Sequence, residues 1–156
     1  MLTDGSCTRT ARRSHDPSGP LPTKAMPYIV TFRKPVAVSD RGQYINDCCV
    51  GGDIVLDRLL PALRTTYGAV QSNQEDWGWF AWFDYERIKL AVDVHTDDAA
   101  RGEFQVHLTS RKPRLLLGSR IEDTPQLDAL RELVLEQLRR WNVDDLEIER
   151  VDADYR

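Results

Sequence analysis

Residues 77–111, WGWFAWFDYERIKLAVDVHTDDAARGEFQVHLTSR, decide the fold of this chain. Apolar side chains alternate with other residues along three runs inside this stretch, and such alternation is typical of strands that bury one face. The charged breaks DYER and TDDAARG fit the turns between the runs. The stretch therefore predicts an antiparallel meander of three strands.

The position of the first turn gives an expected register for the first hairpin. If DYER forms the turn, Phe83 lies opposite Ile88, and the pairing then runs back along both strands. The partners expected on this register are Ala81 with Leu90, Trp79 with Val92, and Trp77 with Val94. Together with Phe104, Val106 and Leu108, these residues are expected to form the buried face of the sheet.

The segment before the meander predicts a strand and then helical structure. Residues 28–32 (YIVTF) are β-branched and aromatic, which favours a strand. From 43 to 67, apolar residues recur every three or four positions, as in an amphipathic helix. Because Gly51-Gly52 interrupts the pattern, we expect a short helix, a hinge, and a longer helix that starts at an Asp53 N-cap and ends near Gly68.

Weaker patterns fill the spaces between these elements. The polar segment 69–76 is expected to be a loop. Residues 115–117 (LLL) are expected to form a short strand or to pack beneath the sheet, and 118–123 to be a connection.

The C-terminal part carries the clearest helix start of the chain. Thr124-Pro125 places an N-cap residue before a proline at the first helical position. An apolar stripe follows at three-and-four spacing, formed by Leu127, Leu130, Val134, Leu138 and Trp141. Residues 146–151 then alternate like a last strand. The predicted order is β-α-β-β-β-α-β, an α+β fold whose mostly antiparallel sheet has two main helices on one face.

Composition indicates one globular domain behind a tail. Residues 1–27 are rich in Ser, Thr, Pro and Arg, so we expect a flexible tail before a single domain at 28–156. Met26 directly precedes the first strand, so translation could start at either Met1 or Met26. The net charge of the chain is −4, and residues 1–27 carry +2, so the remainder carries −6.

Charge, hydropathy and cysteine content narrow the expected partners. An acidic body repels phosphate backbones, so we expect no nucleic-acid partner. No apolar run approaches the ~18 residues of a membrane span, so we expect no membrane partner. Three cysteines, two of them adjacent, form a poor disulfide framework. Since no secretory segment is recognisable, a cytoplasmic location is expected.

The predicted sheet has an unusual second face. Alternation places the following side chains there: Phe80, Trp82, Lys89, Ala91, Asp93, His95, Gln105, His107 and Thr109. A sheet face that is only solvated would favour Lys, Glu, Thr and Ser. Aromatic rings beside histidines and an aspartate therefore predict that something packs over this face, such as a protein partner, a second subunit or a ligand.

One trio on this face suggests chemistry. Asp93 and His95 are two residues apart on one strand, and His107 is expected to lie diagonal to Asp93. A carboxylate with two imidazoles suits zinc or iron, or a proton transfer in which the carboxylate orients a histidine. The alternative is a set of polar residues on a half-exposed sheet, held by ordinary hydrogen bonds. No cofactor or metal ligand is assigned on this pattern alone.

An acidic and aromatic rim precedes the meander. Glu75 and Asp76 stand directly before Trp77, in the stretch QEDWGW. Such a rim fits recognition of a basic protein partner, and the alternative is a solvated loop that leads into a core strand.

Three functions follow from these patterns. The first is a small acidic protein-binding domain without catalysis, of an adaptor, chaperone-like or toxin-neutralising kind, that docks through the second face or the rim. The second is a metal-dependent or small-ligand enzyme centred on Asp93, His95 and His107. The third is a homo-oligomer that uses the same face as its subunit interface.

Overall fold

The computed structural model describes residues 27–116 and 118–151. The expected tail lies outside these residues, except for Pro27, which is buried. The elements in chain order are β1 (Tyr28–Arg33), the 3-10 turns η1 (Arg41–Gln43) and η2 (Asp47–Cys49), α1 (Gly52–Tyr67), β2 (Gln71–Glu75), β3 (Gly78–Tyr85), β4 (Ile88–Asp98), β5 (Glu103–Arg114), β6 (Gly118–Ile121), α2 (Pro125–Arg140) and β7 (Asp144–Arg150).

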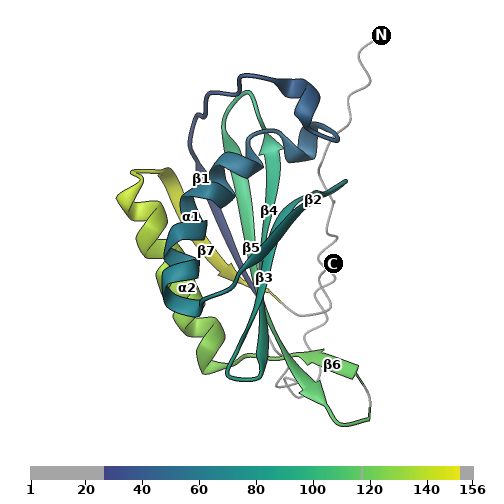
Figure 1. Ribbon diagram of the computed structural model, residues 1–156. Coiled ribbons are helices and arrows are strands. Elements are labelled where there is room, and N and C mark those ends of the chain that lie inside the picture. Colours follow the sequence, from purple (N-terminus) through teal and green to yellow (C-terminus); the bar gives the residue numbers. More distant parts are fainter. Residues whose placement is uncertain (1–26, 117, 152–156) are drawn as a thin grey trace, which may run out of the picture.

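The strands form one antiparallel sheet in the order β2-β3-β4-β5-β1-β7, and β6 pairs with β5 beside this path. Figure 1 shows α1 and α2 next to each other on the same face of the sheet. The predicted α+β class, with helices on one face of a mostly antiparallel sheet, is confirmed. In the described ranges, neither helix is long and apolar enough to cross a membrane.

Two short strands, β2 and β6, were expected to be a loop and a connection. Strand β2 (QSNQE) is polar and mostly exposed, and it joins the sheet by pairing with β3. Backbone hydrogen bonds do not require apolar alternation, so the side chains of an edge strand give no periodic signal. The prediction for 115–117 was wrong for its first two residues, because Leu115 and Leu116 are fully exposed in the turn between β5 and β6.

The predicted strand pairing is wrong by two residues, while the predicted faces of the paired strand residues are right. The β3–β4 turn contains only Glu86 and Arg87, with φ of 50° and 65°. Tyr85 therefore pairs with Ile88, and Phe83 pairs with Leu90. A slip of two leaves every side chain on its original face, because side chains alternate with a period of two.

Helix α1 differs from the prediction at its start. The expected short helix is only the 3-10 turn η2, and the N-cap is Gly51, with φ of 80°, rather than Asp53. Asp53 lies in the first turn and accepts a hydrogen bond of 2.8 Å from the Tyr44 hydroxyl. The helix ends at Gly68, as predicted, where the Gly68 amide donates to the Arg64 carbonyl.

Helix α2 begins as predicted. Thr124 Oγ1 accepts a hydrogen bond of 3.1 Å from the Leu127 amide, and Pro125 occupies the first turn. The buried side chains of both helices pack on the sheet in one core, which includes Leu56, Leu59, Leu63, Leu127, Leu130, Val134 and Leu138. Within residues 27–116 and 118–151, α1 and α2 therefore pack on one face of the sheet and not on the other.

Candidate functional site

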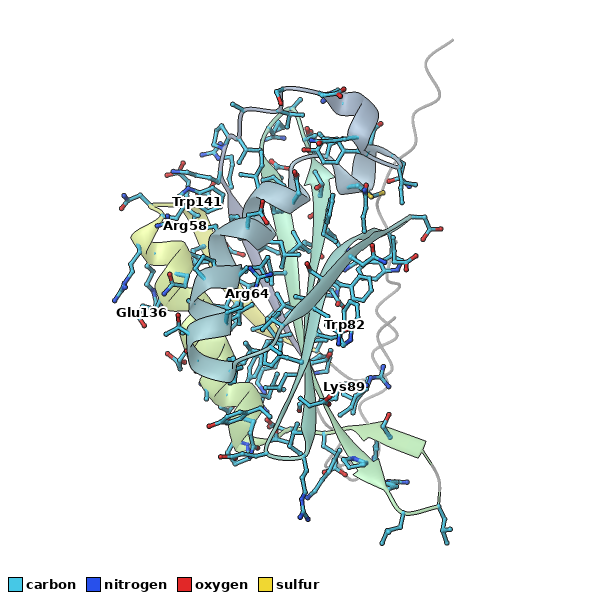
Figure 2. All side chains as sticks on the ribbon, in the orientation of Figure 1. Arg58, Arg64, Trp82, Lys89, Glu136 and Trp141 are labelled. Atoms are coloured by element: carbon cyan, nitrogen blue, oxygen red, sulfur yellow. The ribbon has the colours of Figure 1, made fainter. Side chains whose placement is uncertain are left out.

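The outer face, which we define as the sheet face opposite the helices, brings together the predicted aromatic and histidine residues. Phe80 and Trp82 come from β3, Asp93 and His95 from β4, and His107 from β5. Each of these five side chains is half-buried. In Figure 2, Trp82 and the exposed Lys89 lie on the side of the sheet away from α1 and α2. The predicted composition of this face is confirmed.

The rings of the outer face are in continuous contact. Phe80 stacks on Trp82 with ring centroids 4.7 Å apart, and Trp77 lies 5.5 Å from Phe80. His95 lies 5.1 Å from Trp77 and 4.4 Å from His107. We call this connected set the ring ladder: Trp82, Phe80, Trp77, His95 and His107. Ring pairs at these spacings hold one another in place, so the ladder is largely ordered before any partner arrives.

Trp77 was expected in the core, and this prediction was wrong. Trp77 lies in the turn between β2 and β3, and its ring packs against Phe80 and His95 on the outer side. Gly78 permits this corner, because its φ is 150° and a Cβ there would collide with the Val94 carbonyl. A close backbone crossing of this kind leaves no periodic signal in the sequence, since it depends on which strands become neighbours.

The acidic rim is anchored through its backbone. The Glu75 carbonyl accepts a hydrogen bond of 3.0 Å from the Cys49 thiol, and the Asp76 carbonyl accepts one from the Asn46 side chain. Glu75 and Asp76 are exposed beside Trp77. Two carboxylates thus stand in water at the edge of the ring ladder.

Asp93 lies between two ring-bearing neighbours. It pairs directly with Phe80 on β3 and with His107 on β5, so the expected diagonal relation to His107 was wrong. Burial raises the pKa of Asp93 to about 6, and the positive charge of Arg111 opposes this rise. Among the residues that the structure describes, Asp93 makes no hydrogen bond or ion pair. A poorly solvated carboxylate therefore sits within the aromatic surface.

The two histidines each contact a fixed oxygen. His95 Nδ1 lies 3.0 Å from the Trp77 carbonyl, which can only accept, so Nδ1 carries the proton in this contact. His107 Nε2 lies 3.2 Å from Oε1 of Gln105, and the Gln105 amide donates 2.7 Å to Asp97. These contacts extend the site along the face to Asp97, where burial raises the pKa of the carboxyl.

Asp97 and two residues of β7 belong to the same face, and sequence patterns did not select them. The central strand β1 pairs with both β5 and β7, so Thr31 stands between Gln105 and Glu147, and Ile29 between His107 and Glu149. The outer face thus has an acidic border, formed by Asp97, Glu147 and Glu149, around the central Asp93. No local pattern reveals that the first and last strands pair, so this border is not readable from the sequence.

The structure does not support the hypothesis that Asp93, His95 and His107 bind a metal ion. Within 27–116 and 118–151, no group of three or more His, Cys, Asp or Glu side chains is placed to hold a metal ion. Asp93, His95 and His107 share a face. However, Nδ1 of His95 and Nε2 of His107 each contact a protein oxygen. Their arrangement fits a packed surface better than a coordination sphere.

Comparison of the sequence with known proteins assigns no family to this chain. No protein-family model matches the chain, and no curated protein matches it in sequence.

Proposed function

We propose that this protein is a non-catalytic binding domain that docks a protein partner on its outer face. One observation carries the proposal: five rings form a connected ladder on the sheet face opposite α1 and α2, the two α-helices of the described residues. Aromatic side chains contribute most of the binding energy at many protein interfaces, and histidine adds a polar edge to such a surface.

The chemistry of the face favours a protein over other ligands. Half-buried rings that already touch one another lose little entropy on docking, so more of their contact energy appears as affinity. The acidic border, together with the exposed Glu75 and Asp76, disfavours phosphate backbones and favours a basic protein surface. An adaptor, chaperone-like or toxin-neutralising role in the cytoplasm agrees with these properties.

The homo-oligomer alternative uses the same face and is favoured by a separate observation: the β5–β6 hairpin carries two exposed leucines, Leu115 and Leu116. The metal-dependent alternative rests on Asp93, His95 and His107 alone. Metal analysis of untagged protein that was never exposed to chelator tests this alternative, and stoichiometric zinc or iron would support it.

Quantitative affinity purification tests the proposal with a matched pair of tryptophan variants. Trp82 is on the outer face, while Trp141 is half-buried on the helix side (Figure 2). Trp82→Ala is expected to lose partners that the wild type and Trp141→Ala retain, with at least a tenfold fall in recovery. Circular dichroism and thermal melting check that both variants are folded. Identical partner sets for all three proteins would remove the outer face as the docking site.

A further inference from the structure

The β5–β6 hairpin, which we call the arm, is built from residues 111–116 and 118–121. It projects from the body on the side away from α2, as Figure 1 shows at the lower right. Strand β6 pairs only with β5 among the described strands, so no third strand supports it. At its tip, the side chains of Leu115 and Leu116 are 103% and 95% exposed. Two adjacent leucines in full contact with water are costly, and they mark a contact surface more often than scattered single apolar residues do.

The charge of the arm is opposite to that of the body. Its cations are Arg111, Lys112, Arg114 and Arg120, and the segment 111–121 contains no acidic residue. Lys112, Arg114 and Arg120 are exposed. The arm therefore combines an apolar tip with positive flanks, in a chain whose net charge is −4.

The outer face offers the complementary combination. Its ring ladder is aromatic, Asp93 lies within the ladder, and the acidic border carries Asp97, Glu147 and Glu149. Lys89 and Arg111 pair with each other on this face at the end where the arm begins, and Asp84 pairs with Lys89 on its other side. At the opposite end of the face, the cation Arg33 is neutralised by an ion pair with Asp145. The carboxylates Asp97, Glu147 and Glu149 therefore lie away from the end of the face that carries Lys89 and Arg111.

We propose that the arm of one copy of this protein docks on the outer face of a second copy. Leu115 and Leu116 pack on the ring ladder, and the cations of the arm face the acidic border. The inference rests on the proposed function, because it uses the same docking face and names its occupant.

An arm cannot reach the ladder of its own copy. Trp82, the nearest member of the ladder, is level with Thr109 of β5. The tip at Leu115 is six residues beyond Thr109, which separates them by about 20 Å at ~3.3 Å per residue. The pairing of β5 with β6 holds from Arg111 to Arg114, so the arm does not fold back. The outer face that is complementary to an arm must therefore belong to a second copy of the protein. A foreign partner would have to displace this arm.

Size-exclusion chromatography with light scattering tests the proposal on the full chain. The wild type is expected to self-associate in a concentration-dependent way that weakens as salt screens the charges. An arm variant, Leu115→Ser with Leu116→Ser, and a face variant, Trp82→Ala, are each expected to be monomers. Ile148→Ser is the matched control, because it removes another exposed apolar side chain from a different strand, and it should associate like the wild type.

Mixing the two monomeric variants gives the decisive measurement. The face variant still has an arm and the arm variant still has a face, so the mixture is expected to form a one-to-one heterodimer. A mixture that stays monomeric, or an arm variant that associates like the wild type, would overturn the proposal.

The remaining outcomes separate this inference from the proposed function. If the wild type is a monomer but captures a partner in a Trp82-dependent way, the arm proposal fails and the docking face stands. If a monomeric wild type binds vesicles of phosphatidylglycerol and phosphatidylcholine through Leu115 and Leu116, the arm serves an anionic lipid surface instead, which also overturns the proposal.

Discussion

Asp93 and His107 lie directly opposite each other where β4 pairs with β5, at the centre of the outer face. The pairing places a carboxyl whose pKa is raised to about 6 beside an imidazole, within a surface of stacked rings. The Asp93 carboxyl therefore changes charge in mildly acidic solution, so the charge of the docking face depends on pH.

Asp93 is expected to reduce the stability of the protein as pH rises. Its pKa lies at about 6 in the folded state against an ordinary value of 3.8, so the folded state binds the proton more tightly. The ionised form therefore destabilises the fold, with no penalty below pH 3.8 and the full penalty above about pH 6. The full shift corresponds to about 3 kcal/mol, and partial solvent exposure reduces this to about 1–2 kcal/mol. Urea unfolding of wild type and Asp93→Asn at pH 5 and pH 7.5 measures it.

The variant should gain stability relative to the wild type at the higher pH. The histidines are common to both proteins, so the difference between them isolates Asp93. A constant difference across this range would show that Asp93 is ordinarily solvated.

Truncation of two leucines, one in the core and one at the arm tip, should reduce stability by very different amounts. Leu90 is 0% exposed in the core, whereas Leu115 is 103% exposed at the arm tip. Leu90→Ala is expected to cost about 2–5 kcal/mol of unfolding free energy, since it leaves a cavity, and Leu115→Ala less than about 0.5 kcal/mol. Equilibrium denaturation at low protein concentration, where association does not contribute, gives both values. A large cost at Leu115 would mean that its side chain is buried.

Gly78 should tolerate no side chain, and Gly68 provides the comparison. Both glycines have positive φ, but only a Cβ at Gly78 would meet a backbone carbonyl, that of Val94. Backbone strain alone costs about 1–3 kcal/mol at such positions. Gly78→Ala is expected to exceed Gly68→Ala in loss of stability and also to displace Trp77 from the ring ladder. Thermal melting reports the first effect and the indole NMR signals report the second. Equal melting temperatures for the two variants would contradict the close crossing.

Thr124 is expected to stabilise α2 through its hydroxyl. It accepts from the Leu127 amide at 3.1 Å and donates 3.1 Å to Ser110, which in turn donates to the Glu122 carbonyl. Thr124→Ala should cost about 1–2 kcal/mol, because it removes a buried N-cap, whereas Thr124→Ser keeps the oxygen and most of the stability. Urea denaturation of the two variants measures the difference. If serine were as damaging as alanine, the methyl group rather than the hydroxyl would be responsible.

The faces of the sheet could be predicted from the sequence because the alternation of Leu90, Val92 and Val94 reports burial directly. The register could not, because the turn residues Glu86 and Arg87 adopt positive φ without the glycine or asparagine that usually signals such a turn. An error of two residues in the register keeps every side chain on its face, so the predicted face of Phe80, Trp82 and His107 is correct.

The residues at the borders of the site could not be predicted from the sequence. Glu147 and Glu149 join the outer face only because β1 inserts between β5 and β7. Trp77 joins it only because Gly78 allows a tight corner. Both depend on contacts between segments far apart in the chain, and a periodic pattern within one segment contains no information about them.

β1 and β7, the first and last described strands along the chain, are neighbours in the sheet, and the Val151 amide donates a hydrogen bond of 3.0 Å to the Pro27 carbonyl. A few residues of linker would therefore suffice to join position 151 to position 27. The chain could then be reopened at the two-residue turn after Tyr85, giving a circular permutant with the same sheet. During synthesis, β1 can pair with β5 before β7 has been made. The edge of β1 that pairs with β7 therefore stays exposed until β7 emerges from the ribosome.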